Sequence, residues 1–214
     1  MHVLITGANR GIGAGLADAY GEAGEQVTAT ARDASTGTQL DVTSPDSLAA
    51  LARTLDGAPV DLLICNAGVY LDKSENLADG FDTSMWAESF AVNVTGVFLT
   101  VQALLPNLQS APTPKIAIIS SQMASQERAP GGSYTYRSSK AAALNLGRNL
   151  AHDLKSLNIA VGIYHPGWVR TDMGGDHADI SIEDAVTGLM ARFDALNLDS
   201  SGCFENWDGR PHPY

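Results

Sequence analysis

The chain has 214 residues, which is enough for one domain with a sizeable hydrophobic core. Its formal net charge of −11 argues against nucleic acid and anionic membranes as partners. Hydrophobic residues make up 44% of the chain, and this predicts a globular fold rather than disorder. The two cysteines, Cys65 and Cys203, match no disulfide or metal motif, so we expect both to be reduced thiols.

One stretch without charged residues, 89–114, is long enough to consider as a membrane span. It contains Asn93, Gln102 and Pro106, and this polarity is too high for a helix in lipid. We therefore expect a helix that packs against a neighbour or a partner subunit. The chain reaches the apolar residues 3–5 with no basic leader before them, so we expect a cytoplasmic protein.

The apolar segment at 3–5 predicts a buried strand, and the glycine-rich sequence TGANRGIG follows it at residues 6–13. Helix formers at 14–23 come next, so the glycines occupy a turn between a strand and a helix. In that context Gly7 permits a tight turn, Gly11 lets the backbone approach a pyrophosphate, and Gly13 lets helix and strand pack closely. The pyrophosphate would bind the free N–H groups of the helix start. An ordinary glycine turn is the plainer alternative.

Strands and helices alternate along the rest of the chain. Further strands are predicted at 27–31, 38–40, 61–65, 115–119, 159–164 and 203–206. Further helices are predicted at 45–55, with Ser44 as N-cap, and at 83–105, 136–150 and 181–196. The alternation predicts an α/β fold: a single-domain doubly wound parallel sheet (Rossmann) over 1–214, with about seven strands and helices on both faces.

The link between the second and third strands is too short for the helix that usually joins parallel strands. Only residues 34–37 separate Arg32 and Asp33 from the strand at 38–40. We therefore predict that the helix between strands two and three is missing, and that an irregular loop leaves a shallow, open adenosine pocket.

Tyr136 and Lys140 stand four residues apart in a predicted helix, so their side chains share one helix face. A fixed ammonium favours the phenolate and moves a tyrosine pKa down from about 10. Alone, the pair has a plainer interpretation as a half-buried tyrosine beside a surface lysine. Other motifs favour the functional interpretation of this pair. They follow the carboxyl ends of parallel strands, which face one crevice, so we expect them to lie close together. Besides the glycine turn, they are Asn66-Ala67-Gly68, Asn93, Ser120-Ser121 and Pro166-Gly167.

These motifs, in this order, resemble the short-chain dehydrogenase/reductase family over essentially the whole chain. The narrower similarity is to sniffer-like and C-factor-like carbonyl reductases, and residues 6–13, 165–175 and 204–209 carry it. The resemblance implies an NAD(P)(H)-dependent oxidoreductase that transfers hydride between nicotinamide and a carbonyl or secondary alcohol. The chain departs from the family in the missing helix after strand two. It is also shorter than most members, which implies a short lid over the substrate.

By that resemblance Tyr136 is the acid in reduction and the base in oxidation, and Lys140 binds the nicotinamide ribose and lowers the tyrosine pKa. Ser121 would hydrogen-bond the substrate oxygen, and Asn93 would hold a water in a proton relay. Neighbours on a strand point to opposite faces, so only one of Ser120 and Ser121 can face the crevice. The family pattern favours Ser121.

The resemblance also implies a cofactor site built from several segments. NADP(H) is the preferred cofactor and NAD(H) is possible, because strand two ends in Arg32 rather than in a carboxylate that would repel a 2′-phosphate. Arg10 would be a second cation beside that phosphate, whereas Asp33 argues the other way. The predicted cofactor-binding residues are Gly7, Asn9, Arg10, Gly11, Ile12, Gly13, Arg32, Asp41, Val42, Asn66, Ala67, Gly68, Tyr136, Lys140, Pro166, Gly167, Val169 and Thr171.

We expect no metal site, because Asp172, Asp176 and His177 are interpreted as solvated loop residues, and His165 is interpreted as structural. The expected partners are a small-molecule carbonyl or alcohol and a second copy of the chain. Family members often build a homodimer or homotetramer on the two helices at 83–105 and 136–150. The competing function is a nucleotide-binding regulatory or signalling protein. The complete set of Ser, Asn, Tyr and Lys argues for catalysis.

Overall fold

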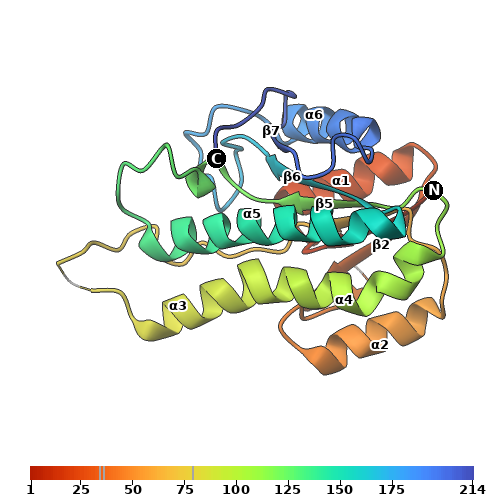
Figure 1. Ribbon diagram of the computed structural model, residues 1–214. Coiled ribbons are helices and arrows are strands. Elements are labelled where there is room, and N and C mark those ends of the chain that lie inside the picture. The colour runs from red at the N-terminus through yellow and green to blue at the C-terminus, as the bar shows by residue number, and fades with distance from the viewer. Residues whose placement is uncertain (34, 36, 79) are drawn as a thin grey trace.

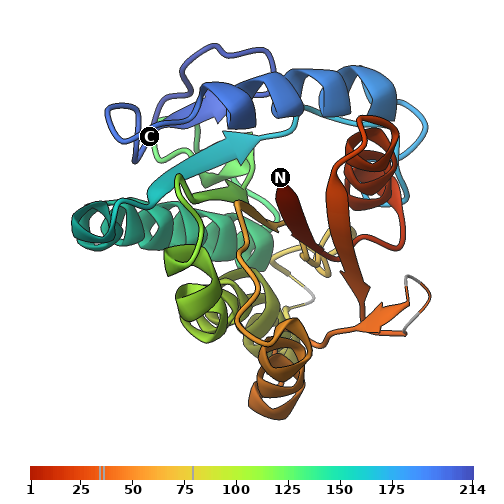
Figure 2. The same cartoon turned by 90° about the vertical axis from the view of Figure 1, so that its right-hand side faces the viewer.

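The computed structural model describes residues 1–33, 35, 37–78 and 80–214. Within that part of the chain a parallel sheet of seven strands forms the centre, in the order β3-β2-β1-β4-β5-β6-β7 (Figures 1 and 2). The predicted doubly wound sheet is confirmed. The strands are β1 (His2–Thr6), β2 (Gln26–Ala31), β3 (Thr38–Gln39), β4 (Leu62–Cys65), β5 (Lys115–Ile119), β6 (Ala160–His165) and β7 (Phe204–Asn206).

Helices cover both faces of the sheet, and Figure 2 shows the two helix layers on opposite sides. Helices α1 and α6 pack together on one face, while α2, α4 and α5 lie on the other. Ser44 is the N-cap of α2, as predicted, and its hydroxyl accepts from the Ser47 N–H. The α-helices are α1 (Gly11–Glu22), α2 (Pro45–Leu55), α3 (Thr83–Phe90), α4 (Gly96–Gln109), α5 (Tyr134–Leu154) and α6 (Ile182–Ala195).

The strands contribute alternate residues to two separate cores. Val3 and Ile5 of β1 join the core under α1 and α6, together with Leu16 of α1. Leu4 and Leu63 join the opposite core, under α2, α4 and α5. Successive side chains of a strand point to opposite faces, so a sheet covered on both sides needs apolar residues at every position. This requirement explains why the central strands are continuous apolar runs.

The connection from β2 to β3 contains no helix among its described residues, which confirms the prediction that the helix between these two strands is missing. Arg32 and Asp33 form a turn, and the Leu40 N–H donates a hydrogen bond to the Ala31 carbonyl at 2.8 Å. Ala34 and Thr36 of the predicted loop lie outside the described residues.

The prediction of one regular helix at 83–105 is wrong in two respects: the helix is interrupted, and it ends later than predicted. Helix α3 passes into a π-helical segment, Ala91–Thr95, before α4 continues to Gln109. By length and composition alone, Thr83–Gln109 could cross a membrane, but a buried core helix passes the same test. In this fold Val97, Val101 and Leu104 of α4 are buried against the sheet.

Candidate active site

The predicted catalytic residues meet at the carboxyl end of β5 and the start of α5. Ser121 follows β5 as the N-cap of a 3₁₀ turn, Gln122–Ala124, and its hydroxyl accepts from the Met123 N–H at 3.1 Å. Tyr136 and Lys140 lie one turn apart on α5 and are only 7% and 5% exposed. The Lys140 Nζ lies 5.7 Å from the centroid of the Tyr136 ring, so the predicted shared helix face is present.

The structure distinguishes the two serines. The Ser121 hydroxyl interacts by hydrogen bonding with the Tyr136 phenol. The Ser120 hydroxyl instead donates to the Lys140 carbonyl at 3.2 Å and is buried behind α5. The pleat of β5 therefore directs Ser121, and not Ser120, toward the tyrosine.

The pKa of Tyr136 differs from the expectation that Lys140 lowers it. In the protein alone, burial raises the pKa of Tyr136 to about 12, and the hydrogen bond from Ser121 only partly opposes this shift. Burial also lowers the pKa of Lys140 to about 8, although its ammonium donates to the Ile119 carbonyl at 2.9 Å. Desolvation therefore dominates both groups, and Tyr136 is held as a neutral phenol at neutral pH.

Asn93 lies in the π-helical segment and is 1% exposed. Its Nδ2 donates to the Val69 carbonyl and to the Ser139 hydroxyl, and its Oδ1 accepts from the Val69 N–H. Because these bonds tie the loop after β4 to α5, the side chain has a clamping role that sequence reasoning did not predict. A π-turn widens the helix locally and is frequent at functional sites.

The glycine turn has the shape of an anion cradle. Gly7 and Gly11 adopt positive φ values of 66° and 56°, which other residues rarely adopt. A Cβ at Gly13 would lie 2.3 Å from the Gly7 carbonyl oxygen, so only glycine fits there. Helix α1 begins without a side-chain cap, because Arg10 at its N-cap makes no capping hydrogen bond. Its first N–H groups are therefore available to a phosphate, and this fits a dinucleotide.

The segment after β4 lies directly against this cradle. Asn66 donates from Nδ2 to the carbonyls of Thr6 and Gly7, at 3.0 and 2.8 Å. Ala67 donates its N–H to the Thr6 hydroxyl at 3.0 Å. A Cβ at Gly68 would lie 3.2 Å from Asn93 Oδ1 and 3.4 Å from Lys140 Nζ. The Asn66 side chain thus holds the glycine turn in place, a role that the sequence did not reveal.

At the adenosine end, Asp41 and Val42 follow β3. The Asp41 carboxylate accepts from the N–H and hydroxyl of Thr43, and these bonds, together with the positive charge of Arg32, lower the Asp41 pKa. Val42 packs against α4 so closely that a Cβ at Gly96 would lie 2.7 Å from its Cγ2. Arg32 is exposed, and its positive charge acts on Asp41.

Two predicted nucleotide contacts have protein partners in the structure. Arg10 makes an exposed ion pair of 2.7 Å with Asp172, which joins the glycine turn to the loop after β6. Such pairs contribute little to stability, so a phosphate can compete for the guanidinium. Asn9 and Ser35 hydrogen-bond Asp33 and lower the pKa of its carboxyl, with Ser35 the larger cause. Asp33 therefore remains a carboxylate close to the glycine turn.

The loop after β6 forms the other wall of the crevice. Gly167 has a φ of 90°, and Val169 is buried and forms a bridge to Ile180. The Thr171 side chain faces the glycine turn, because a Cβ at Gly11 would meet its Cγ2 at 3.3 Å. Pro166 and Gly167 directly follow β6, so this loop lies at the same sheet edge as Ser121.

Other polar side chains near this loop make no metal cluster. Asp172 is bound to Arg10, and Asp176 and His177 are exposed. In the described part of the chain, no group of three or more His, Cys, Asp and Glu side chains is arranged to hold an ion.

Sequence reasoning missed two residues that contact the tyrosine. The Tyr70 ring stacks on Tyr136 with centroids 4.2 Å apart, and the Tyr70 hydroxyl is 2.6 Å from Ser133 Oγ. Asp72 is fully buried and accepts the backbone N–H groups of Thr135 at 2.7 Å and of Tyr136 at 3.3 Å. Both come from residues 70–82, in the segment between β4 and α3. Asp72 lies 62 or more residues before α5, so its capping role has no local sequence signal.

The comparison with protein families identifies the class of this site. The model of the short chain dehydrogenase family matches residues 1–180. The chain therefore belongs to the short-chain dehydrogenase/reductase family, whose members are NAD(P)-dependent oxidoreductases.

Two named relatives are similar over most of the chain. The C-signal protein of Myxococcus xanthus is 35% identical over 77% of this chain and 99% of its own length. The 1-hydroxy-2-glutathionyl-2-methyl-3-butene dehydrogenase of Rhodococcus sp. strain AD45 is 34% identical over 97% of this chain and 96% of its own.

Solved structures confirm the resemblance to sniffer-type carbonyl reductases. The NADPH-bound carbonyl reductase from chicken fatty liver superposes with a TM-score of 0.91, at 29% identity, over 100% of this chain and 98% of that chain. The carbonyl reductase Sniffer of Drosophila melanogaster gives a TM-score of 0.90 at 25% identity, over 100% and 99%.

Proposed function

We propose that this protein reduces a carbonyl compound to an alcohol with NADP(H), using Tyr136 as the proton donor. The observation that carries the proposal is the buried group of Ser121, Tyr136 and Lys140, together with the glycine turn and the start of α1, which has no side-chain cap. The carbonyl reductases among the similar structures support the same reaction class.

Each of the three side chains has a different role in the proposed reaction. Ser121 donates a hydrogen bond to the substrate oxygen, and the Tyr136 hydroxyl transfers its proton to that oxygen as negative charge develops. The high pKa of Tyr136 keeps this proton in place at neutral pH. Lys140 lies close enough to stabilise the phenolate that results. When bound, NADPH supplies the hydride that the carbonyl carbon accepts.

The preference for NADP(H) over NAD(H) is part of this proposal. Arg32 follows β2 and is exposed toward solvent, and Arg10 has only a weak exposed partner. Two guanidiniums suit a 2′-phosphate, because each can donate two parallel hydrogen bonds. The similar chicken carbonyl reductase was solved with NADPH.

Replacing Arg32 with alanine tests this preference. A charged hydrogen bond contributes about 1.5–3 kcal/mol, so NADPH should bind roughly ten- to a hundredfold more weakly while NADH binds as before. Calorimetric titration of both cofactors into wild type and Arg32→Ala gives the answer, with Arg53→Ala of α2 as the control. Equal weakening of both cofactors would show that Arg32 does not contact the 2′-phosphate.

Tyr136→Phe tests the proton donor, since it removes one hydroxyl and little packing. General acid catalysis contributes roughly 10²–10⁴ in rate, so turnover should fall by at least that factor while NADPH still binds. Oxidation of NADPH with a panel of aldehydes and ketones measures turnover, and Tyr134→Phe is the matched control on the same helix. Near-normal activity in Tyr136→Phe excludes this role.

A second candidate function is a nucleotide-binding signalling protein, and the similarity to C-signal favours it. Such a protein would bind NADP(H) with the same cradle but would turn over none of the carbonyl compounds. The same panel therefore separates the two functions.

A further inference from the structure

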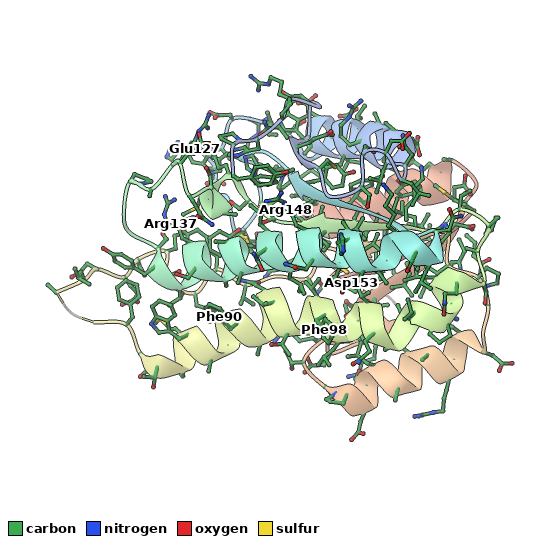
Figure 3. The ribbon with its side chains drawn as sticks, in the orientation of Figure 1. Phe90, Phe98, Glu127, Arg137, Arg148 and Asp153 are labelled. Carbon is green, nitrogen blue, oxygen red and sulfur yellow. The ribbon has the colours of Figure 1, made fainter. Side chains whose placement is uncertain are left out.

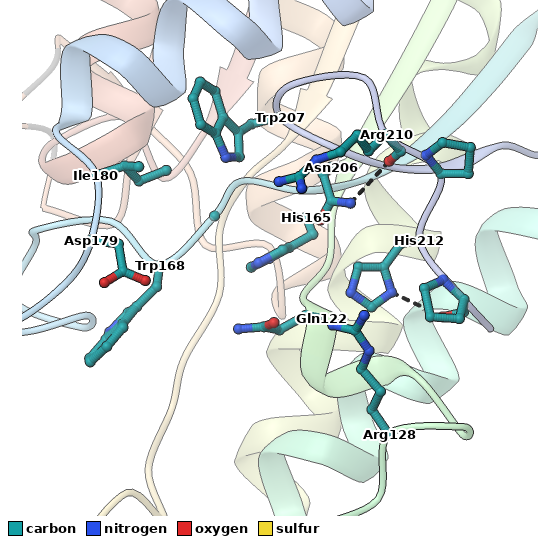
Figure 4. Close-up of a pocket in the computed structure, with 13 residues that line it drawn as sticks. Gln122, Arg128, His165, Trp168, Asp179, Ile180, Asn206, Trp207, Arg210 and His212 are labelled. Carbon is teal, nitrogen blue, oxygen red and sulfur yellow. Dashed lines mark hydrogen bonds between the residues drawn. The ribbon is translucent and has the colours of Figure 1, made fainter.

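A pocket of about 400 Å³ opens beside Ser121, between the loops after β5 and β6 and the C-terminal tail, residues 207–214 (Figure 4). Gln122, which directly follows Ser121, lines it, as does Gly167 of the loop after β6. In the sheet β5 lies between β4 and β6, so this pocket lies on the β6 side of Ser121. It leaves room for a substrate on that side, while the segment after β4 approaches the site from the other.

Tyr70 reaches Tyr136 from this segment after β4. The two rings are stacked, with centroids 4.2 Å apart and planes inclined by 21°. Two aromatic rings attract each other in this arrangement, so the contact is a favourable one. A stacked neighbour also obstructs rotation of the Tyr136 ring, whose hydroxyl has to point toward Ser121 for proton transfer to a shared substrate oxygen.

The backbone on both sides of Tyr70 is fixed by side chains of other elements. Directly before it, the N–H and the carbonyl of Val69 both hydrogen-bond the Asn93 side chain at 2.9 Å. Shortly after it, the Asp72 carboxylate accepts the Thr135 N–H at 2.7 Å. Tyr70 therefore has a defined place between the π-helical segment and the start of α5, although it belongs to a loop.

The hydroxyl of Tyr70 is anchored as well. It lies 2.6 Å from the Oγ of Ser133, the residue directly before α5. Ser133 has a φ of 47°, in the left-handed region that residues other than glycine rarely adopt, and it makes no capping hydrogen bond to α5. Such a conformation persists only where its surroundings hold it. Asp72 binds the first N–H groups of α5 instead, so the Ser133 hydroxyl is left to bind Tyr70.

Four groups surround Tyr136. Ser121 hydrogen-bonds its hydroxyl, the Lys140 Nζ lies 5.7 Å from its ring centroid, Asp72 accepts its backbone N–H and Tyr70 covers its ring. The pKa of Tyr136 is raised to about 12, with burial as the largest cause and Tyr70 and Asp72 as smaller ones. Water at the ring would stabilise the phenolate, so the cover by Tyr70 favours the neutral phenol, which is the form that donates a proton.

We propose that Tyr70 is a positioning residue for the reduction: its ring, anchored by Ser133, holds the Tyr136 phenol toward Ser121 and keeps water from it. The inference rests on the proposed function, in which Tyr136 gives its proton to the substrate oxygen. Removal of the Tyr70 ring should therefore slow the chemical step without weakening cofactor binding, and should let Tyr136 lose its proton at a lower pH.

The first test follows Tyr136 without turnover. Tyrosine labelled with ¹³C at Cζ distinguishes phenol from phenolate by its chemical shift, and comparison with Tyr136→Phe assigns the signal. In wild type Tyr136 should remain mostly a phenol up to about pH 11, whereas in Tyr70→Ala it should titrate closer to the ordinary pKa of about 10. Tyr70→Phe keeps the stacked ring and should titrate as wild type does. Tyr134→Ala, which shortens an exposed tyrosine on the same helix, is the control and should also match wild type.

The second test measures NADPH oxidation with the panel of aldehydes and ketones. A displaced catalytic group can cost about 10² in rate, so kcat of Tyr70→Ala should fall roughly 10- to 100-fold while the Kd for NADPH is unchanged. Reduction needs the protonated phenol, so its decline at high pH should begin about one pH unit lower in this variant. Tyr70→Phe should restore most of the rate, and Ser133→Ala should match Tyr70→Phe because each removes the same hydrogen bond.

The outcomes separate the two proposals. A Tyr70→Ala variant that is merely less stable, with unchanged titration of Tyr136 and unchanged kcat, would overturn the positioning role and leave carbonyl reduction standing. Equal losses in Tyr70→Phe and Tyr70→Ala would overturn the role of the stacked ring. A shifted titration in a protein that reduces no carbonyl compound would support the shielding of Tyr136 and overturn the proposed function. Circular dichroism shows whether Tyr70→Ala is folded, and Tyr70→Leu, which keeps apolar bulk without a stacked ring, takes its place if it is not.

Discussion

Asp72 shows at the scale of one residue how a side chain far away in the sequence controls the proposed proton donor. Its buried carboxylate accepts the N–H groups of Thr135 and Tyr136 at the start of α5. A helix start has unsatisfied N–H groups and a positive potential, so a carboxylate there is stabilising. Burial is the largest cause of the raised pKa of Tyr136. The negative charge of Asp72 raises this pKa further, as does Tyr70. Asp72 is thus a positioning residue that also tunes the phenol.

Asp72→Asn should shift the pH dependence of alcohol oxidation to lower pH. Oxidation requires the phenolate of Tyr136, which forms as the pH rises through its pKa. Removal of the charge lowers that pKa, while the asparagine Oδ1 can still accept one N–H group. The measurement is the pH–rate profile of oxidation, with Asp46→Asn in the first turn of α2 as the control. An unchanged profile in Asp72→Asn would refute the electrostatic role.

At the scale of the elements, α6 holds the tail that encloses the pocket. A Cβ at Gly188 of α6 would lie 2.5 Å from both the carbonyl oxygen and the Cε3 of Trp207. Because one of these atoms belongs to the backbone, a side-chain rotation cannot relieve the contact. The absence of a Cβ at Gly188 is therefore what lets the tail approach the helix.

Gly188→Ala should destabilise the protein although alanine favours helix. Overpacking costs about 1–3 kcal/mol and the gain in helix propensity is about 1 kcal/mol, so we expect a net loss of up to about 2 kcal/mol in the free energy of unfolding. Gly21→Ala in α1 is the matched control, because nothing lies within 4 Å of its Cβ. This control should stabilise by about 0.5–1 kcal/mol. Urea denaturation measures both, and a Gly188→Ala variant as stable as Gly21→Ala would contradict the close packing.

At the scale of the whole molecule, we propose that α4 and α5 form a subunit interface. Figure 3 views the molecule onto these helices, with Phe98 on α4 and Arg148 and Asp153 on α5. Phe98 is 42% exposed, and it lies in the charge-free stretch 89–114 of a chain with a net charge of −11. An exposed apolar side chain on an uncharged helix is more stable when a second copy covers it.

Light scattering at micromolar concentration should therefore give a mass of at least twice 22.4 kDa. Phe98→Glu should shift the protein toward the monomer, because it would place two like charges in a symmetric interface. Leu77→Glu, at a more exposed position outside these helices, should leave the mass unchanged. A wild-type mass of 22.4 kDa would refute the interface.

The sequence by itself determined the class of the sheet and singled out most residues of the candidate site. Short apolar runs such as Leu62–Cys65 indicate strands covered on both faces, and their alternation with helices indicates a parallel sheet. In such a sheet the carboxyl ends of the strands share one edge, so Asn66, Ser121 and Pro166 had to lie near one another. Local spacing alone placed Tyr136 and Lys140 on one face of α5.

Only the tertiary structure decided how the environment acts on these residues. Burial, and not the neighbouring ammonium, dominates the pKa of Tyr136, and burial depends on the whole packed core. Asp72 reaches α5 across a loop without periodicity, and the π-turn at Asn93 interrupts an otherwise regular helical pattern. His165 and His212 come from opposite sides of the last crossover, and they meet only because the tail returns along β7. Contacts between residues so distant in the chain follow from packing, which no local pattern encodes.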